Sequence, residues 1–279
     1  TSGSTASALS PSYLSAAGSW SQGQANVVLT SAAKNFCWLT RVTGHFVGTG
    51  EVVRVFIDAN NNWEIGGASA QQGVAGSADC IPYSKFIPEA GGVAGPSWTA
   101  EASVFTGPCP NCGGSGAFGV GASRNLWQGD AAIMLSGMTG QFLGGGESID
   151  VQQAHAPSLN WLDAGAFSPN GVGAWGRVLF IGVPGSDFRP LFFQDVNGPY
   201  SLSTIPFEGL ATATMIPTSE GFCYFVNIGG AFAGGGELVQ ITTVMMGGVQ
   251  HWSLGVQTQQ SNGTSAQARC YAFNQSVSQ

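Results

Sequence analysis

The sequence predicts an all-β protein, because one pattern with strand-like alternation recurs three times and no stretch keeps a helical period. The pattern G-x-F-x-G-x-G-E-x-[VI]-x-[VI] occupies residues 44–55, 140–151 and 230–241 without a gap. Charged residues are only 8% of the chain, against about 25% in an ordinary globular domain, and Gly accounts for 43 of 279 residues. Since 43% of residues are apolar, we expect a packed, Gly-rich β protein rather than a disordered chain.

Each copy should contribute about four strands with one apolar face, giving three internal repeats. In the second strand of the first copy, Val53, Val55 and Ile57 alternate with more polar residues and share one face. The Asp- and Asn-rich run at 58–62 is typical of a turn. The strands expected in this copy are 36–43, 51–57, one that begins at 63, and 74–83.

The repeats divide the chain into six segments. The first connecting segment is rich in Gly and Pro, and the second is rich in apolar residues; either could form loops or further strands. The predicted segments are an N-terminal arm at 1–35, repeat one at 36–83, a connecting segment at 84–130, repeat two at 131–181, an apolar connecting segment at 182–221 and repeat three at 222–279.

Two arrangements of the repeats fit this pattern. Three four-stranded sheets could close around a pseudo-threefold axis, as in a β-prism, or the repeats could form a tandem of small β-sandwiches. The apolar residues of the second connecting segment slightly favour one compact body.

Four of the six cysteines keep constant positions relative to the repeat. The second copy carries apolar residues, Ile133 and Val178, where the other two copies carry cysteines. The joint presence and joint absence of two cysteines indicate a bonded pair that stabilises by about 4 kcal/mol, and the alternative is a set of buried free thiols in a cytosolic protein. The predicted disulfides are Cys37–Cys80 and Cys223–Cys270.

The remaining cysteines, Cys109 and Cys112, form a C-x-x-C motif between Gly- and Pro-rich flanks. Such a motif can be redox-active, half of a metal site or a small disulfide loop. A redox motif favours a βα context, and a zinc site needs a second pair of ligands that the sequence does not offer. A local disulfide is the preferred interpretation, and we predict no metal site and no cofactor.

The charge pattern excludes several classes of partner. The net charge is −7, and the 8 Lys and Arg residues form no basic run, so binding to nucleic acid or to an anionic membrane is not expected. No run of 18 apolar residues is present, so membrane insertion is not expected either. Surface glycans, or further copies of the same chain, remain as partners.

The invariant residues of the repeat are interpreted as structural. We expect the phenylalanines to be buried in equivalent sites and the glutamates to accept hydrogen bonds from backbone amides of the Gly-rich turn. The alternative for the glutamates is glycoside hydrolysis, which uses a pair of carboxylates about 5–9 Å apart. The residues concerned are Phe46, Phe142, Phe232, Glu51, Glu147 and Glu237.

Three tryptophans next to amide or imidazole side chains are candidates for sugar binding, because a flat ring can stack on the apolar face of a pyranose. The alternative is that each tryptophan is a core residue. The candidate ligand-binding residues are Trp63 with Asn61 and Asn62, Trp161 with Asn160, and Trp252 with His251.

The cysteine-paired pattern resembles small Gly-rich repeats in the tip regions of bacterial adhesins and phage tail fibres. The resemblance is carried by Trp63-Glu-Ile65-Gly66-Gly67 with Gln71-Gln72, and by Trp252-Ser-Leu254-Gly255 with Gln259-Gln260. It covers mainly 36–83 and 222–273, and the second copy departs from it by lacking cysteines. The resemblance implies extracellular attachment or a structural role in a fibre.

These observations predict a non-enzymatic extracellular protein, secreted or on a cell or virion surface, that binds surface glycans or forms the tip or structural part of a fibre. The alternative is a purely structural subunit of an extracellular filament or virion. A third possibility is a secreted glycoside hydrolase that uses one of the repeat glutamates.

Overall fold

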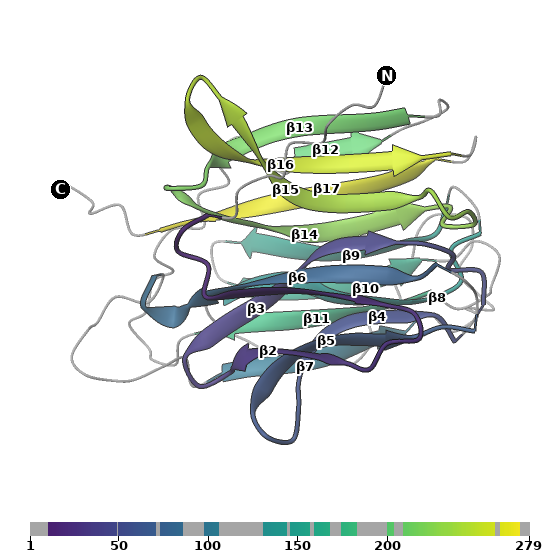
Figure 1. Cartoon of the computed structure of the whole chain (residues 1–279), viewed down its shortest axis with the longest axis horizontal. Helices are drawn as coiled ribbons and strands as arrows, with labels where there is room; N and C mark the ends of the chain where they lie inside the picture. Colours follow the sequence, from purple (N-terminus) through teal and green to yellow (C-terminus); the bar gives the residue numbers. More distant parts are fainter. Residues whose placement is uncertain are drawn as a thin grey trace.

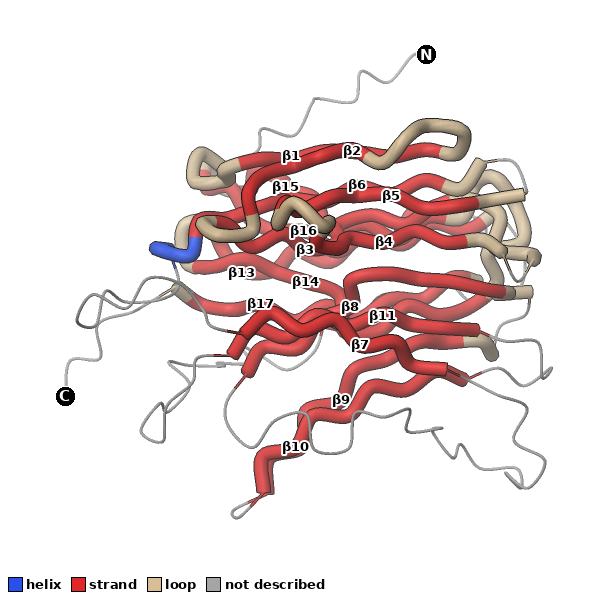
Figure 2. The backbone as a smooth tube through the Cα atoms, turned by 90° about the horizontal axis from the view of Figure 1, so that it is seen from below, coloured by secondary structure: helices blue, strands red, loops and turns tan. Residues whose placement is uncertain are grey.

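The computed structural model describes residues 11–48, 50–70, 73–85, 98–105, 131–143, 146–156, 159–167, 174–182, 200–203, 209–259 and 263–273. Within these ranges the secondary structure is strand, apart from one short 3₁₀ helix, η1 (Tyr83–Lys85). Figure 2 shows the strands running side by side across the molecule, with the single helical turn at one end. The prediction of an all-β protein is confirmed.

The described strands form three sheets, two of six strands and one of five (Figure 1). The sheet orders are β1-β6-β3-β15-β16-β13, β2-β5-β4-β8-β11-β7 and β10-β9-β14-β17-β12. The strand bounds are β1 (Ala16–Ser21), β2 (Val27–Ser31), β3 (Asn35–Thr43), β4 (Val52–Ile57), β5 (Asn62–Ala68), β6 (Ala75–Pro82), β7 (Trp98–Phe105), β8 (Ala131–Gly140), β9 (Ser148–Ala156), β10 (Leu159–Phe167), β11 (Ala174–Gly182), β12 (Tyr200–Ser203), β13 (Gly209–Pro217), β14 (Gly221–Gly230), β15 (Leu238–Met246), β16 (Val249–Thr258) and β17 (Thr264–Ala272).

Every repeat divides its four strands between two sheets. The first and fourth strands pair with each other in one sheet, and the second and third strands pair in another. The second strand of each repeat then pairs with the first strand of the next: β4 with β8, β9 with β14, and β15 with β3. Because the third repeat pairs back onto the first, the pairing is cyclic.

The segments before the repeats also contain strands. β1, β7 and β12 lie next to the fourth strand of the repeat that follows each of them, namely β6, β11 and β17. β2 and β13 lie next to the third strands β5 and β16. The described parts of these segments therefore extend the sheets of the repeats.

The phenylalanine of the repeat lies where the three Gly-rich loops meet. The amide of Phe46 donates to the carbonyl of Phe232, that of Phe142 to Phe46, and that of Phe232 to Phe142, each at 2.7 Å. The three rings are fully buried and pack edge to face, with centroids 5.8–6.2 Å apart. This closed ring of hydrogen bonds and aromatic contacts joins the three repeats.

The first glycine of the pattern is required by its backbone conformation. Gly44 and Gly230 have φ angles of 108° and 97°. A Cβ at either position would lie about 2 Å from the carbonyl oxygen of Gly73 or Gly263 respectively. The amides of these glycines donate to the carbonyl of the repeat glutamate in the preceding copy, so the turn is closed by a neighbouring repeat.

The predicted disulfides Cys37–Cys80 and Cys223–Cys270 are both present and are confirmed. Each joins directly opposite residues of the first and fourth strands of its repeat. In the second repeat the residue opposite Ile133 is Phe180, and not Val178 as the spacing from Gly171 indicated. The fourth strand is two residues out of the predicted register because spacing along a loop does not fix strand pairing. Cys109 and Cys112 lie outside the described residues.

One β-bulge recurs in all three repeats and shapes the sheets. The register between the first and fourth strands shifts at Thr40, at Ser136 and at Val226, which are the extra residues of β3, β8 and β14. A bulge bends its strand and increases the local twist. β3 and β15 pair over only three residue pairs, from Arg41 to Thr43, and they separate at the bulge.

Candidate ligand-binding site

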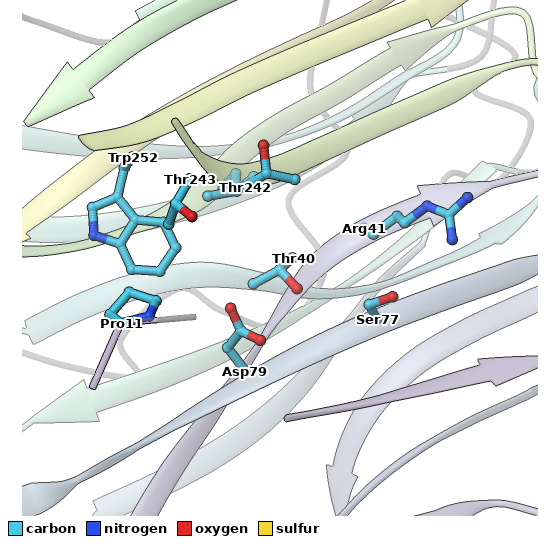
Figure 3. A pocket seen from close by; sticks show the side chains of 9 residues that line it. Pro11, Thr40, Arg41, Ser77, Asp79, Thr242, Thr243 and Trp252 are labelled. Carbon is cyan, nitrogen blue, oxygen red and sulfur yellow. The ribbon is translucent and has the colours of Figure 1, made fainter. Parts of the chain in front are cut away.

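A pocket of about 190 Å³ lies where β3 and β15 separate (Figure 3). Ser77 and Asp79 on β6 face it because they alternate with the buried Ala78 and Cys80. The lining residues are Pro11, Thr40, Arg41, Ser77, Asp79, Ile241, Thr242, Thr243 and Trp252. The pocket thus combines strands of the first and third repeats with a residue that precedes β1.

Asp79 is the most unusual residue of the pocket. Removal of its carboxyl group from water raises its pKa from 3.8 to about 6. Among the described residues, none donates a hydrogen bond to this carboxylate or forms an ion pair with it. Asp79 is half-buried, and a desolvated carboxylate without a protein partner destabilises the fold when it is charged, which makes this residue a candidate for a functional role.

Asp79 also breaks the internal symmetry of the chain. It precedes the second cysteine of the first disulfide and pairs with Trp38, and the equivalent positions in the other repeats are Leu179 and Arg269. The pocket is therefore a property of one junction and not of the repeat fold.

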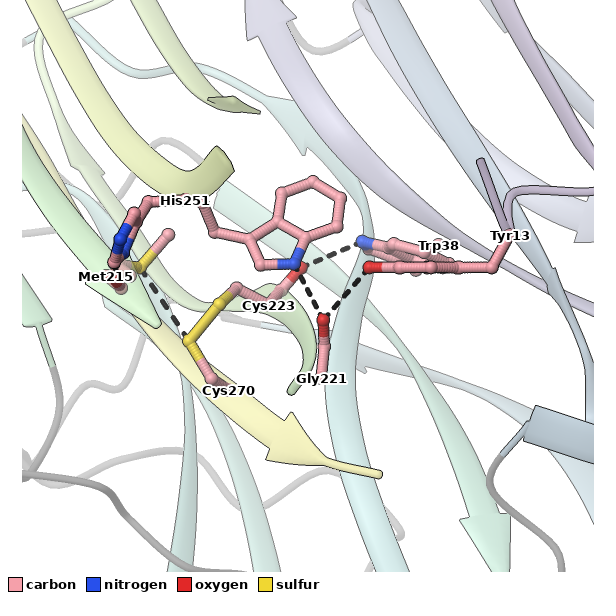
Figure 4. Close-up of a disulfide and its surroundings, with 8 residues drawn as sticks. Tyr13, Trp38, Met215, Gly221, Cys223, His251 and Cys270 are labelled. Atoms are coloured by element: carbon pink, nitrogen blue, oxygen red, sulfur yellow. Dashed lines mark hydrogen bonds between the residues drawn. A yellow bond between two sulfur atoms is a disulfide. The ribbon is translucent and has the colours of Figure 1, made fainter. Parts of the chain in front are cut away.

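Hydrogen bonds hold the indole of Trp252 at one wall of the pocket. Trp252 is 1% exposed, and its indole N–H donates to the carbonyl of Gly221 at 2.8 Å. The same carbonyl accepts a hydrogen bond from the hydroxyl of Tyr13 at 3.0 Å, and burial raises the pKa of that hydroxyl. Figure 4 shows both contacts next to the disulfide Cys223–Cys270. These contacts fix the indole that forms one wall of the pocket.

Hydroxyl groups and one cation complete the lining. Thr40, Ser77, Thr242 and Thr243 supply hydroxyls that can donate or accept hydrogen bonds. Arg41 pairs with Ser77 across the strands and lies at the opposite end of the pocket from Trp252 (Figure 3). The arrangement offers a carboxylate acceptor, several neutral hydroxyls and a guanidinium donor, with a buried indole behind them.

The size of the pocket limits its ligand. Pockets for drug-sized molecules typically measure about 300–1,000 Å³. A volume of about 190 Å³ therefore fits a small polar molecule or the terminal unit of a longer one.

Two tryptophans that the sequence suggested as sugar platforms lie in the core. Trp63 and Trp252 are 0% and 1% exposed. Their indole groups donate to the carbonyls of Asn35 and Gly221, which are the first residues of β3 and β14. Trp63 is closed off from any ligand, whereas Trp252 meets the pocket at its wall.

The remaining predicted sugar-binding residues do not gather at one place. Asn61 lies in the turn between β4 and β5, and Asn62 is the first residue of β5; the Asp58 carboxylate accepts the Asn62 amide at 2.7 Å. His251 lies on β16, and its Nδ1 is 2.9 Å from the Met215 carbonyl. Asn160 and Trp161 lie on β10 in a different sheet, and their side chains are outside the described set.

The repeat glutamates are buried: Glu51 and Glu147 are 1% exposed and Glu237 is fully buried. Neither carboxylate oxygen of Glu237 has a hydrogen-bond partner, and one oxygen of Glu51 has none. The expected bonds from turn amides to the carboxylate are therefore not seen at Glu237. It is the backbone carbonyls of these glutamates that accept from the next repeat.

Sequence reasoning missed Asp79, Thr40 and Thr242. A signal was present, because the residue before the second cysteine is Asp79 in the first repeat and Arg269 in the third. The position of Thr242 next to them depends on pairing between the first and third repeats, which the pattern alone did not specify.

The described residues contain no group of three or more His, Cys, Asp or Glu side chains placed to hold a metal ion. No helix among them is long and apolar enough to cross a membrane. Comparison of the chain with protein-family models, with curated proteins and with solved structures finds no match.

Proposed function

We propose that this chain is a non-enzymatic extracellular attachment protein that binds the terminal unit of a surface glycan in the pocket between β3 and β15. The observation that carries the proposal is the half-buried carboxylate of Asp79, which has no hydrogen-bond partner among the described residues, in a pocket lined by hydroxyls. Its occurrence in only one repeat indicates a function beyond maintaining the repeat fold.

A sugar offers the hydrogen-bond donors that the Asp79 carboxylate lacks. Adjacent hydroxyls of a pyranose can donate two hydrogen bonds to one carboxylate, and such charge-assisted bonds are short and strong. Thr40 and Thr242 can exchange hydrogen bonds with further hydroxyls, and Arg41 can donate to a ring or hydroxyl oxygen.

The disulfides support the extracellular part of the proposal. Two cross-strand disulfides are typical of proteins from oxidising compartments, and cytosolic proteins rarely keep them. Because only 8% of the residues are charged, polar contacts of this chain depend mainly on hydroxyl and amide groups.

Binding is favoured over hydrolysis by the number of acids in the pocket. Glycoside hydrolysis uses two carboxylates on either side of the scissile bond. Among the described residues that line this pocket, Asp79 is the single carboxylate.

A structural subunit of a filament is the second candidate, and β13 favours it. This strand lies at the edge of its sheet, is nine residues long and carries no charged residue. An uncharged edge of this length can pair with a strand of another molecule. Negative-stain microscopy of the concentrated protein would show filaments if β13 serves this purpose.

A glycan array tests the principal proposal. The labelled native protein, Asp79→Asn and the matched control Glu220→Gln would be applied to the same array. Glu220 is an exposed acid that is not among the residues lining the pocket, so its variant should retain the native binding profile. Asp79→Asn should lose at least tenfold in signal on every bound glycan. Absence of binding by the native protein, or equal binding by Asp79→Asn, would refute the proposed site.

A further inference from the structure

The turn of the β15–β16 hairpin exposes an unusual number of apolar side chains. Figure 1 shows this hairpin curling away from the body at the upper left. Gly247 and Gly248, both with positive φ, form its tight turn. The exposed side chains, with their exposed fractions, are Val244 (39%), Met245 (59%), Met246 (53%) and Val249 (46%).

The corresponding hairpin of the first repeat has a polar turn. Between β4 and β5 the carboxylate of Asp58 accepts hydrogen bonds from the backbone amides of Asn60 and Asn62, at 2.9 and 2.7 Å. The turn of β15–β16 is thus another place where the third repeat departs from internal symmetry. Repeat stability does not require an apolar turn, because the first repeat folds with a polar one.

The base of the β15–β16 hairpin is fixed to the body. The backbone amide of Thr218 donates to the Gln250 carbonyl at 2.8 Å, and the Gln250 side chain donates to the Thr243 hydroxyl at 3.0 Å. Gln250 is opposite Met245 in the hairpin, so these polar contacts begin beside the apolar tip and continue to Thr243. The tip, residues 244–249, is therefore supported by a polar collar made of Thr218, Thr243 and Gln250.

We propose that this tip inserts into the surface of a lipid bilayer made of neutral lipids. At about 3.4 Å per residue, Val244, Met245 and Met246 of β15 extend about 10 Å, and on β16 the apolar part of the tip is Val249 alone. This length matches the depth of about 5–10 Å at which interfacial segments bury their apolar side chains. Four partly exposed side chains present much less than the roughly 800 Å² per partner of a stable protein–protein interface, so the tip alone is too small for a second copy.

The charges near the tip select the kind of lipid. Residues 238–250 contain no charged side chain, and the acid nearest to the collar in sequence is the exposed Glu220. With a net charge of −7, the protein is repelled by anionic surfaces. The expectation of no membrane insertion rested on the lack of basic runs and of long apolar spans, and a hairpin tip needs neither of them.

Vesicle flotation tests this inference independently of the glycan site. Native protein would be mixed with phosphatidylcholine vesicles, or with vesicles containing phosphatidylserine, in low and high salt. The variants would be Met245→Ser/Met246→Ser and the control Leu210→Ser, which removes an equally exposed apolar side chain (57%) from β13. Asp79→Asn would be included so that loss of glycan binding and loss of lipid binding can be distinguished.

The native protein, Leu210→Ser and Asp79→Asn should float with phosphatidylcholine vesicles to the same extent. The double methionine variant should float at least tenfold less, with an unchanged melting temperature because both side chains are exposed. Binding should be weaker on phosphatidylserine vesicles at low salt and insensitive to salt on neutral ones. No flotation of the native protein, equal flotation of the double variant, or concentration-dependent self-association that the double variant abolishes would overturn the proposal.

Discussion

Asp79 shows at the scale of one residue how function and stability oppose each other. Its pKa in the folded protein, about 6, lies above the ordinary value of 3.8. Between these pH values the folded state binds more protons than the unfolded state, so stability falls as pH rises from about 4 to about 6 and stays lower above. The free energy of unfolding falls by about 2–3 kcal/mol over this pH range.

Asp79→Asn should therefore raise the free energy of unfolding near pH 7 by up to about 2–3 kcal/mol, because the desolvated charge is removed. Chemical denaturation of both proteins between pH 4 and pH 8 measures the effect. Only in the native protein should the free energy of unfolding fall between pH 4 and pH 6 because Asp79 ionises. Identical pH profiles for the two proteins would show that Asp79 does not titrate in this range.

Affinity for a glycan should rise between pH 5 and pH 7, whereas the stability of the native protein falls over the range from about pH 4 to pH 6. The ionised carboxylate is the stronger acceptor, so the native protein should bind several-fold more tightly at pH 7 than at pH 5. Titration calorimetry with a glycan found on the array would measure this difference. Affinity that does not change with pH would mean that the ligand does not contact Asp79.

The repeat glutamates should respond unequally to the same substitution. Glu147→Gln should lower the free energy of unfolding by about 1.5–3 kcal/mol if its carboxylate holds the turn as the sequence predicts. Glu237→Gln should leave stability unchanged or increase it, because both carboxylate oxygens of Glu237 are buried without a partner. Thermal melts of the two variants provide the comparison, and equal losses would contradict the difference proposed between the two repeats.

Single residues also show where sequence reasoning fails. The burial of Trp63 could have been read from the chain, because Trp63 and Ile65 share one face of a strand and both are fully buried. Asn61 lies in the turn before it and Asn62 is the first residue of β5, and their neighbour Asp58 binds the backbone. Proximity to polar residues in the sequence therefore did not indicate an exposed ring.

At the scale of elements, the cysteine pairs were predictable because their two members are present or absent together. The Gly-rich turns were predictable for a similar reason, since the same spacing recurs in three copies. The strands that precede each repeat were not, because β1 and β12 are short and have no pattern in common. Their position is set by pairing with β6 and β17, which are distant in sequence.

The Gly-rich turn makes a direct prediction about backbone conformation. Gly230→Ala should lower the free energy of unfolding by about 3 kcal/mol or more, because φ is +97° and the new Cβ would lie 2.1 Å from the Gly263 carbonyl oxygen. Gly23→Ala is the matched control, since φ there is +84° but no atom lies within 4 Å, and it should cost about 1–2 kcal/mol. Denaturant titration of both variants tests the difference. Similar losses would mean that the backbone shifts to accept the side chain at Gly230.

At the scale of the whole molecule, the cyclic pairing makes the repeats depend on one another. Each sheet combines central strands from two repeats, and the three phenylalanines form one packed centre. This arrangement creates the pocket, since Asp79 and Thr242 come from different repeats. Sequence periodicity predicts that such copies exist, but it does not state which copy pairs with which.

Phe142→Ala should therefore destabilise the entire chain by about 3–5 kcal/mol, and not the second repeat alone. Differential scanning calorimetry should show one transition in both proteins, with a lower midpoint in the variant. Two separated transitions would mean that the repeats unfold independently.

The closure between β3 and β15 also has a consequence for synthesis. β3 ends at Thr43, but its partner begins at Leu238, so most of the chain leaves the ribosome before this pairing can form. Until then one side of β3 is an unpaired edge, which other chains can join. The disulfide from Cys37 to Cys80 needs only the first repeat and can hold β3 against β6 during this interval. Early formation of this disulfide would then protect the nascent chain from pairing with other chains, in addition to stabilising the folded protein.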